Sequence, residues 1–283
     1  MCITFLYTNS SDSSFKYKLI LINNRDEFYR RKTLDASVKT DDDGLIKIYG
    51  TDVETEVLGT WLAISKRSDV IRIGNLLNVP GECLNVKKTD LKGRGPIALN
   101  FISSNDTIEV HNEKLCNVCM SYNSFNFLSV EITSSDIKTY FTSNSTQSVV
   151  KLNDNFIGAS NSPVDTPLKK VIEGKKRFQK IIENSRNKSE KDLIEELINL
   201  LKWEDKHYPD EELLRRRGND AELFSSVHVK GNDFYGTRTR TIIFVDQDNN
   251  IDYIEETMMN DDPKNAKWKT SRFTVNKDVV VEH

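Results

Sequence analysis

Cysteine is scarce in this sequence, with four residues among 283: Cys2, Cys83, Cys116 and Cys119. That number is too small for a disulfide-stabilised scaffold. The first residues also lack a basic region followed by an apolar run, which is the pattern that marks a secretory signal. We therefore expect a reducing compartment and predict a cytoplasmic protein.

Long apolar runs are missing as well. The most apolar stretches, YKLILI at 17–22 and RTIIFV at 240–245, are as long as a strand and far too short to cross a bilayer. The net charge of −3 provides no overall attraction to nucleic acid or to anionic membranes. The basic stretch at 168–180 is interpreted as the solvated face of a helix, because no interleaved aromatic residues accompany its lysines as a stacking platform. We predict no transmembrane segment and no nucleic-acid partner.

Neither an internal repeat nor a Pro- or Gly-rich linker divides the chain, and we predict a single domain over residues 1–283. Short apolar segments between polar turns predict strands through the first half of the chain and again near its end. The predicted strands are 3–8 and 17–23 around the turn 9–14, 60–65 and 70–75, 125–132, 137–142, 154–160, 239–246, 251–256 and 271–275.

Between these two strand-rich regions the apolar residues recur at helical spacing. Thr166 is predicted to cap a helix whose first residue is Pro167. A second helix is predicted to begin at Ser189, with Asp192 completing an approximate capping box, and a shorter helix is predicted within 93–105. Strands, then helices, then strands favour the α+β class with layered sheets and helices.

Cys116 and Cys119, with His111 upstream, have a spacing that suggests a metal or redox site. A zinc site needs further ligands, and few His and Cys residues remain elsewhere in the chain. If 114–122 is a strand, positions three apart point to opposite faces of it. We predict no metal and no cofactor.

The start of the chain, MCITFLYT, places a thiol directly after the initiator methionine. One interpretation is a small apolar residue that begins a strand. The other is that Met1 is removed, so that Cys2 carries a free α-amino group and a thiol together. Such an amine has a pKa of about 8 and serves as a general base near neutral pH. A nearby guanidinium would make the thiol a better nucleophile.

Pairing of 2–8 with 17–23 around a turn centred near residue 12 places Cys2 opposite residue 22 or 23. The next four residues are polar: Asn24, Arg25, Asp26 and Glu27. They are expected to lie beside the amino terminus, where Arg25 would supply the positive field and Asp26 would orient the amine or the thiol proton. The alternative is an exposed turn whose charges are merely solvated.

Attack on an amide carbonyl also needs donors for the developing oxyanion. Asn75 and Asn161 each follow a predicted strand, and an asparagine side chain donates two N–H bonds without carrying charge. The alternative for both residues is ordinary turn chemistry.

Several longer motifs in this chain resemble the Transport and Golgi organisation protein 2 family, also called the NRDE family. The resemblance spans nearly the whole sequence in the expected order. It rests on Met1-Cys2-Ile3, NNRDEFYRR at 23–31, GTWLAIS at 59–65, KGRG at 92–95, FNFL at 125–128, GASNSPVDTPLKK at 158–170, YGTRTRTIIFVD at 235–246 and ETMM at 256–259.

That resemblance implies the fold of the N-terminal-nucleophile hydrolases, an αββα sandwich of two antiparallel sheets between helical layers. The sequence is also similar to cysteine amidohydrolases that cleave bile-salt amides and penicillins. By motif position, the similarity implies these catalytic residues: Cys2, Asp26, Asn75, Asn161 and, less securely, Arg25. We expect the ligand to be contacted by Asn24, Glu27 and Arg238.

Three functions stay open on this basis. The first is an enzyme that hydrolyses an amide or related acyl C–N bond. The second is a carrier or chaperone that binds haem or an acyl lipid in the same pocket without turnover, and the third is a scaffold for secretory-pathway proteins. The resemblance further implies a role in Golgi organisation and protein secretion, with possible association with the Golgi or mitochondria.

Overall fold

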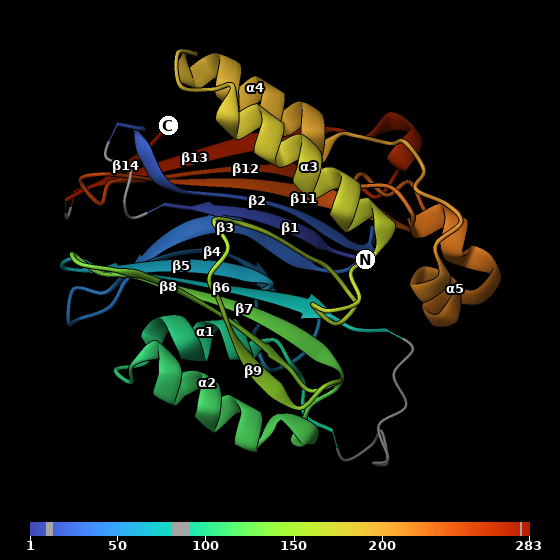
Figure 1. The fold of residues 1–283 in the computed structure, drawn as a ribbon, viewed down its shortest axis with the longest axis horizontal. Coiled ribbons are helices and arrows are strands. Elements are labelled where there is room, and N and C mark those ends of the chain that lie inside the picture. The colour runs from blue at the N-terminus through green and yellow to red at the C-terminus, as the bar shows by residue number, and fades with distance from the viewer. Residues whose placement is uncertain (10–13, 81–90, 278) are drawn as a thin grey trace. The chain divides into compact units, whose positions relative to one another are not determined.

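The computed structural model describes residues 1–9, 14–80, 91–277 and 279–283. Cys83 and most of the turn predicted at 9–14 lie outside the described residues. The remainder forms two compact units, one made of Met1–Arg30 with Asp154–His283 and the other of Arg31–Asn153. Figure 1 shows the helices and strands of both units.

The first unit contains a seven-stranded antiparallel sheet with the order β10-β1-β2-β11-β12-β13-β14. Helices α3 and α4 pack against its strands β1, β2, β10 and β11. The strands are β1 (Ile3–Thr8), β2 (Tyr17–Phe28), β10 (Phe156–Ala159), β11 (Tyr235–Asp246), β12 (Ile251–Met258), β13 (Trp268–Asn276) and β14 (Val279–Glu282); the helices are α3 (Lys169–Glu183), α4 (Glu190–Leu201), α5 (Glu211–Arg217) and the short 3₁₀ segments Gly218–Phe224 and Pro263–Asn265.

The hairpin of β1 and β2 forms as predicted, but its predicted register is wrong. Ile3 pairs with Asn24 and Thr8 pairs with Leu19, so paired positions sum to 27. The pair nearest the turn joins Thr8, the last residue of β1, to Leu19, the third residue of β2. The predicted centre near residue 12 assumed instead that the second strand pairs with the first from residue 17 onward. The observed register moves the start of the chain toward the polar end of β2.

The polar run after the predicted strand 17–23 is itself strand, since β2 continues to Phe28. Asn24 pairs with both β1 and β11, and the residues from Arg25 to Phe28 pair with β11. The side chains of Asn23, Asn24, Arg25 and Asp26 are buried. Buried polar groups need partners, so this part of β2 must be surrounded by matching donors and acceptors.

An apolar cluster lies where α3 and α4 cover the sheet, and it includes Phe5, Phe178 and Leu197. Gly174 permits the close approach of α3 to β1, because a Cβ there would overlap the ring of Phe5. The alternation along β1 directs Met1, Ile3 and Phe5 into this cluster.

The two predicted helix starts have different outcomes. Ser189 caps α4 by accepting from the Asp192 amide, as predicted. The predicted start at Pro167 is wrong, since α3 begins at Lys169. Its first turn is instead capped from elsewhere in the chain, because the Asp210 carboxylate accepts from the Lys169 amide at 2.6 Å.

The second unit has its own seven-stranded antiparallel sheet, in the sequential order β3 to β9. Helix α1 packs on β5 and β6, and α2 packs on β7 to β9. The elements are β3 (Thr33–Thr40), β4 (Ile46–Asp52), β5 (Leu62–Arg67), β6 (Val70–Asn78), α1 (Pro96–Ser103), α2 (Ile108–Asn117), the 3₁₀ segment Cys119–Ser121, β7 (Phe125–Ile132), β8 (Ile137–Ser143) and β9 (Ser148–Leu152).

Each unit is thus an antiparallel sheet with helices, and the predicted α+β class is confirmed. The conditional strand at 114–122 is wrong, because Cys116 lies in α2 and Cys119 in the 3₁₀ segment that follows it. Thr107 caps α2 by accepting from the Val110 amide, a local signal that apolar spacing does not reveal.

Within the described residues, none of the helices combines the length and apolar content needed to cross a membrane.

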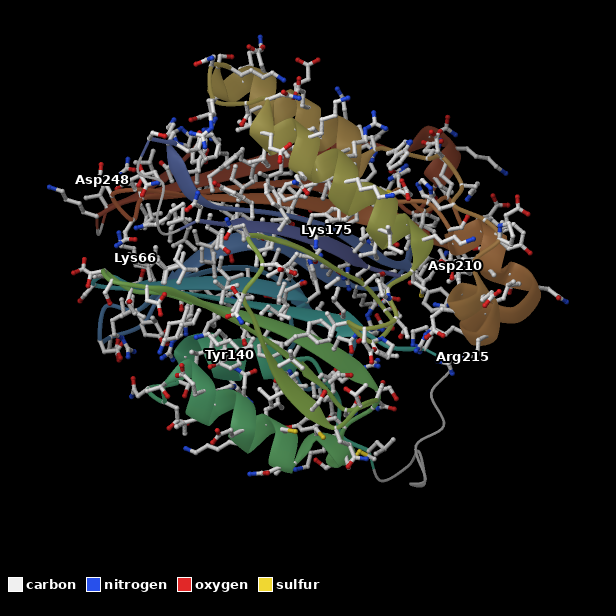
Figure 2. All side chains as sticks on the ribbon, in the orientation of Figure 1. Lys66, Tyr140, Lys175, Asp210, Arg215 and Asp248 are labelled. Atoms are coloured by element: carbon white, nitrogen blue, oxygen red, sulfur yellow. The ribbon has the colours of Figure 1, made fainter. Side chains whose placement is uncertain are left out.

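Asp210 caps two helices at once: its carboxylate accepts from Lys169 of α3 and, at 3.0 Å, from Leu213 of α5. Figure 2 shows Asp210 where the chain enters α5. Removal of one cap costs about 1 kcal/mol, so Asp210→Ala should lower the free energy of unfolding by about 2 kcal/mol. Urea unfolding measures this loss. Ser189→Ala removes a single cap and is the matched control; an equal loss in both variants would contradict the double cap.

Candidate functional site

The antiparallel pairing brings four strand ends to one edge of the first sheet. This edge holds the beginning of β1, the end of β2, the beginning of β11 and the end of β10. Ile3 lies opposite Asn24, Thr4 opposite Ala159, and Thr237 opposite Asp26. The start of the chain therefore meets the polar residues of β2, as the sequence predicts for this hairpin.

The amino group of Met1 is buried at this edge. Its nitrogen lies 3.6 Å from the Asp26 carboxylate, with both groups fully buried, and it donates a hydrogen bond to the Tyr235 hydroxyl. Burial lowers the pKa of this amine, an effect that the charge of Asp26 opposes and that of Lys170 reinforces. A proton is therefore held less tightly here than on an ordinary chain terminus.

Asp26 is held by β11 on its other side. Its Oδ1 accepts from the Thr237 hydroxyl at 2.6 Å, and its backbone oxygen accepts from the Tyr235 hydroxyl at 2.9 Å. Burial raises the pKa of Asp26, while the amino group and Lys170 act in the opposite direction. The carboxylate and the amine thus share a buried environment that disfavours the charged form of each.

The thiol of Cys2 lies at the same edge. Its Sγ is 3.8 Å from the backbone oxygen of Asp26, and the residue is 8% exposed. Burial raises the pKa of this thiol, and the amino group and, more weakly, Arg25 counteract that rise. The predicted positive field of Arg25 is present, but burial outweighs it while Met1 is attached. The thiol is then mainly protonated.

A bulge in β11 shapes the site beside Asp26. The register with β2 shifts between Thr237 and Thr239, so that Arg238 occupies the bulged position. Bulges next to functional sites often redirect a side chain. The Arg238 guanidinium donates to the backbone oxygen of Phe28 at 3.0 Å, which ties the bulge to the end of β2.

Asn161 is connected to Cys2 by hydrogen bonds of the neighbouring residue Ser160. Ser160, directly after β10, donates from its hydroxyl to the backbone oxygen of Cys2 at 2.6 Å and to Oδ1 of Asn161 at 3.1 Å. Both residues are buried. The structure therefore brings Asn161 beside Cys2, where the oxyanion role predicted for it stays a prediction.

Asn24 and Glu27 have local structural contacts. Asn24 donates from Nδ2 to the backbone oxygens of Leu201 and Val227, at 2.8 and 3.0 Å, and so ties the end of α4 to β2. Glu27 accepts from the amide of Phe28 at 2.9 Å. The ligand contacts predicted for Asn24 and Glu27 stay predictions.

Asn75 belongs to the second unit. It lies in β6, opposite Leu62 of β5 and Leu128 of β7, and is fully buried. Its Nδ2 donates to the backbone oxygen of Trp61 at 3.0 Å. The oxyanion role of Asn75 also stays a prediction.

Four residues at this edge were not singled out from the sequence: Ser160, Lys170, Tyr235 and Thr237. All four lie within the motifs GASNSPVDTPLKK and YGTRTRT, but none has the acid, thiol or amide side chain that drew attention to other positions. Hydroxyl groups in these motifs are the signal that would have found three of them.

The interpretation of 168–180 as the solvated face of a helix is wrong for Lys170. Lys170 is 0% exposed and donates from Nζ to the backbone oxygen of Met1 at 3.3 Å. It precedes Gly174 and Phe178 by four and eight positions, and both face the sheet. That helical spacing predicts burial, but the lysine side chain favoured a solvated interpretation.

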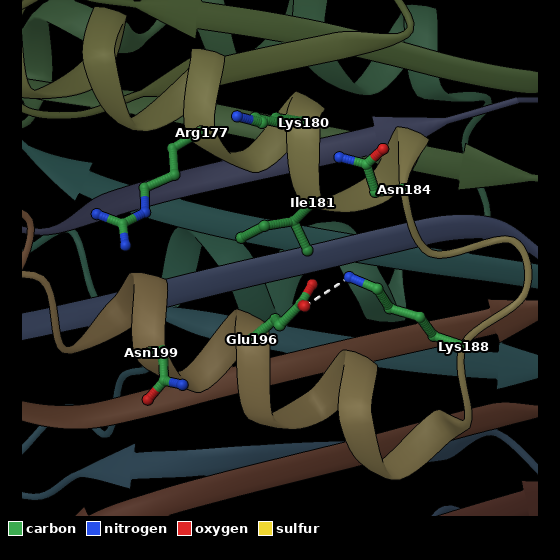
Figure 3. A pocket seen from close by; sticks show the side chains of 7 residues that line it. All are labelled: Arg177, Lys180, Ile181, Asn184, Lys188, Glu196 and Asn199. Atoms are coloured by element: carbon green, nitrogen blue, oxygen red, sulfur yellow. Dashed lines mark hydrogen bonds and ion pairs between the residues drawn. The ribbon is translucent and has the colours of Figure 1, made fainter.

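A separate pocket of about 370 Å³ lies between α3 and α4. Figure 3 shows Lys188 turned toward Glu196 across it. Its lining holds none of the predicted site residues and no thiol; the residues are Arg177, Lys180, Ile181, Asn184, Lys188, Glu196 and Asn199. The pocket is thus distinct from the edge with Cys2. No group of three or more His, Cys, Asp or Glu residues in the described ranges is arranged to hold a metal ion.

The burial of Lys170 predicts a pH dependence of stability. Burial lowers the pKa of Lys170 from 10.5 to about 8 in the folded protein. Between these values the unfolded chain binds more protons, so stability rises with pH, by up to about 3 kcal/mol. The difference in free energy of unfolding between wild type and Lys170→Met, measured with urea from about pH 7 to about pH 11, should show this rise.

Lys180 lies on the exposed face of the same helix and provides the matched control. The curve of Lys180→Met should run parallel to that of wild type. A Lys170→Met curve that is also parallel to wild type would contradict the shifted pKa.

Residues 1–260 match the family Transport and Golgi organisation 2. The chain is 35% identical to the Transport and Golgi organization protein 2 of Drosophila melanogaster over 96% of this chain and 97% of that protein, and 28% identical to the human homolog over 97% and 99%.

Among solved structures, a penicillin V acylase from Agrobacterium tumefaciens aligns with a TM-score of 0.51 at 10% identity, covering 98% of this chain and 92% of that one. This likeness confirms the predicted fold of the N-terminal-nucleophile hydrolases, with its two antiparallel sheets and helices. The chain belongs to the Transport and Golgi organisation 2 family.

Proposed function

We propose that this protein is a cysteine amidohydrolase whose nucleophile is Cys2 after excision of Met1. One observation carries the proposal: an amino group, a thiol and a carboxylate meet in a buried space at the edge of one sheet. The likeness to a penicillin V acylase concerns the fold, and it supports the proposal only in that this fold is compatible with such chemistry.

Excision of Met1 would convert the Cys2 nitrogen from an amide into an amine. That amine takes the thiol proton, and the thiolate attacks the acyl carbon of the substrate amide. The C–N bond then breaks as the ammonium returns its proton to the leaving amine, which leaves a thioester on Cys2. Water, deprotonated by the same amine, hydrolyses the thioester to release the acid and restore the thiol.

The neighbours of Cys2 have roles in these steps. Asp26 orients the amine, and Thr237 holds the carboxylate in place through its 2.6 Å hydrogen bond. Arg25 provides positive charge that favours the thiolate. Asn161 would donate an N–H bond to the oxyanion, and the same role for Asn75, which belongs to the second unit, stays a prediction.

Two measurements test this function in sequence. The intact mass of the purified protein should show the loss of Met1. An activated ester, such as a p-nitrophenyl ester of a short acid, should then acylate wild type at Cys2. Because alanine has no nucleophile, Cys2→Ala should abolish this modification, which peptide mass spectrometry would locate. Cys119→Ala, which removes another buried thiol, is the control and should leave the modification intact.

Retention of Met1 would contradict the proposal, because the Cys2 nitrogen would then have no basicity. The burial of Met1, which is 2% exposed, is compatible with a retained amino terminus, and the second candidate function, a carrier of haem or an acyl lipid, does not require its excision. Such a carrier would bind ligand stoichiometrically with an affinity that Cys2→Ala leaves nearly unchanged.

The names of the relatives associate those proteins with transport and Golgi organisation. On the strength of family membership we propose the same cellular role for this chain. Expression in cells depleted of their own family member should restore protein secretion and Golgi morphology, scored by secreted reporter and by microscopy. If the hydrolase reaction underlies the role, Cys2→Ala should fail to rescue while Cys119→Ala rescues. Failure of wild type to rescue would contradict the role itself.

A further inference from the structure

Lys170 is a charged residue that the proposed reaction does not use. It lies in the first turn of α3, which Figure 1 shows beside the amino terminus. Its side chain is 0% exposed, and its Nζ donates to the backbone oxygen of Met1 at 3.3 Å. Over the part of the chain that the structure describes, no carboxylate forms an ion pair with Lys170 within 4.0 Å.

A buried ammonium group is costly unless acceptors surround it. The acceptor shown for Lys170 belongs to Met1, the residue whose excision would create the proposed base. Asp26 still attracts the ammonium from a greater distance, whereas Arg217 repels it. Once Met1 is gone, Lys170 therefore faces the site with a donor that needs a new acceptor.

The Met1 carbonyl also shows what kind of acceptor fits. It is an acyl oxygen, on a carbon joined to the nitrogen of Cys2, and it lies next to the thiol-bearing residue. The methionine side chain extends from that acyl group into the apolar cluster under α3 and α4. The same place would therefore accept the acyl oxygen of an amide substrate, with an apolar part of the acyl group beyond it.

We propose that Lys170 binds the acyl oxygen of the substrate in the processed protein and stabilises the oxyanion that forms on it. The inference rests on the proposed amidohydrolase function and adds a residue to it. Lys170 stays in place. Its hydrogen bond to the Met1 oxygen is replaced by a hydrogen bond to the acyl oxygen of the substrate. Its proton stays on Nζ throughout, so the bonds made and broken are those of the reaction described above.

Two reagents separate this role from a general effect on the thiol. A p-nitrophenyl ester places negative charge on an acyl oxygen when the thiolate attacks it. Methyl methanethiosulfonate reacts with the same thiolate at sulfur and develops no acyl oxyanion. The rate constants for both modifications at Cys2, followed by intact mass, are compared for wild type, Lys170→Met, Lys170→Gln and Lys180→Met.

Loss of one oxyanion donor reduces acylation by about 100-fold or more, so Lys170→Met should show that loss with a change of less than about threefold toward the thiosulfonate. Lys170→Gln, which keeps a neutral donor, should fall between Lys170→Met and wild type. Lys180→Met should match wild type with both reagents. If Lys170→Met does not fold, as judged by circular dichroism, the glutamine variant still tests the ratio of the two rates.

Equal losses with both reagents would overturn the inference, since Lys170 would then act on the thiol alone. Unchanged acylation in the Lys170 variants would overturn it as well, while the amidohydrolase function would stand. Absence of acylation at Cys2 in wild type would instead contradict the proposed function, and the role of Lys170 with it.

Discussion

The amino group of Met1 lies inside the first unit, 3.6 Å from a carboxylate that is equally buried. Charged groups enter such an environment only with compensation, and here the groups around the terminus come from three elements. Asp26 lies on β2, Tyr235 and Thr237 lie on β11, and Lys170 lies on α3. The need to satisfy one buried terminus therefore connects the central strands of the sheet to the helix that covers them.

The antiparallel topology makes this convergence possible. Strand β1 starts at the chain terminus and lies between β2 and β10. Because both neighbours are antiparallel to β1, both end at the edge where β1 begins. Next to β2, the beginning of β11 carries a bulge that faces Asp26 and Arg25. Polar side chains from segments more than 200 positions apart thus share one water-excluded space. Members of one fold class can use such a space for different chemistry, so function depends on these side chains.

The residue at position 1 has two consequences for this space. With Met1 attached, this space holds the first residue of the chain itself: an apolar side chain, a carbonyl bound by Lys170 and an amine paired with Asp26. In that state burial raises the pKa of the Cys2 thiol, which favours its protonated form. In the proposed reaction, excision of Met1 would remove this residue and create the base in one event. The contacts that anchor the unprocessed terminus would then be available to a ligand.

The sequence by itself determined the local features, because they depend on neighbouring residues. Apolar segments between polar turns predicted β1, β5, β7 and β11, and the Ser189 cap predicted the start of α4. The thiol at position 2 and the polar run at 24–27 were likewise visible, and the hairpin suggested that they meet. Only the tertiary structure decided the register of that hairpin, the capping of α3 by Asp210 and the burial of Lys170. Each of these depends on partners distant in sequence, and the free energy that selects them comes from packing that no local pattern contains.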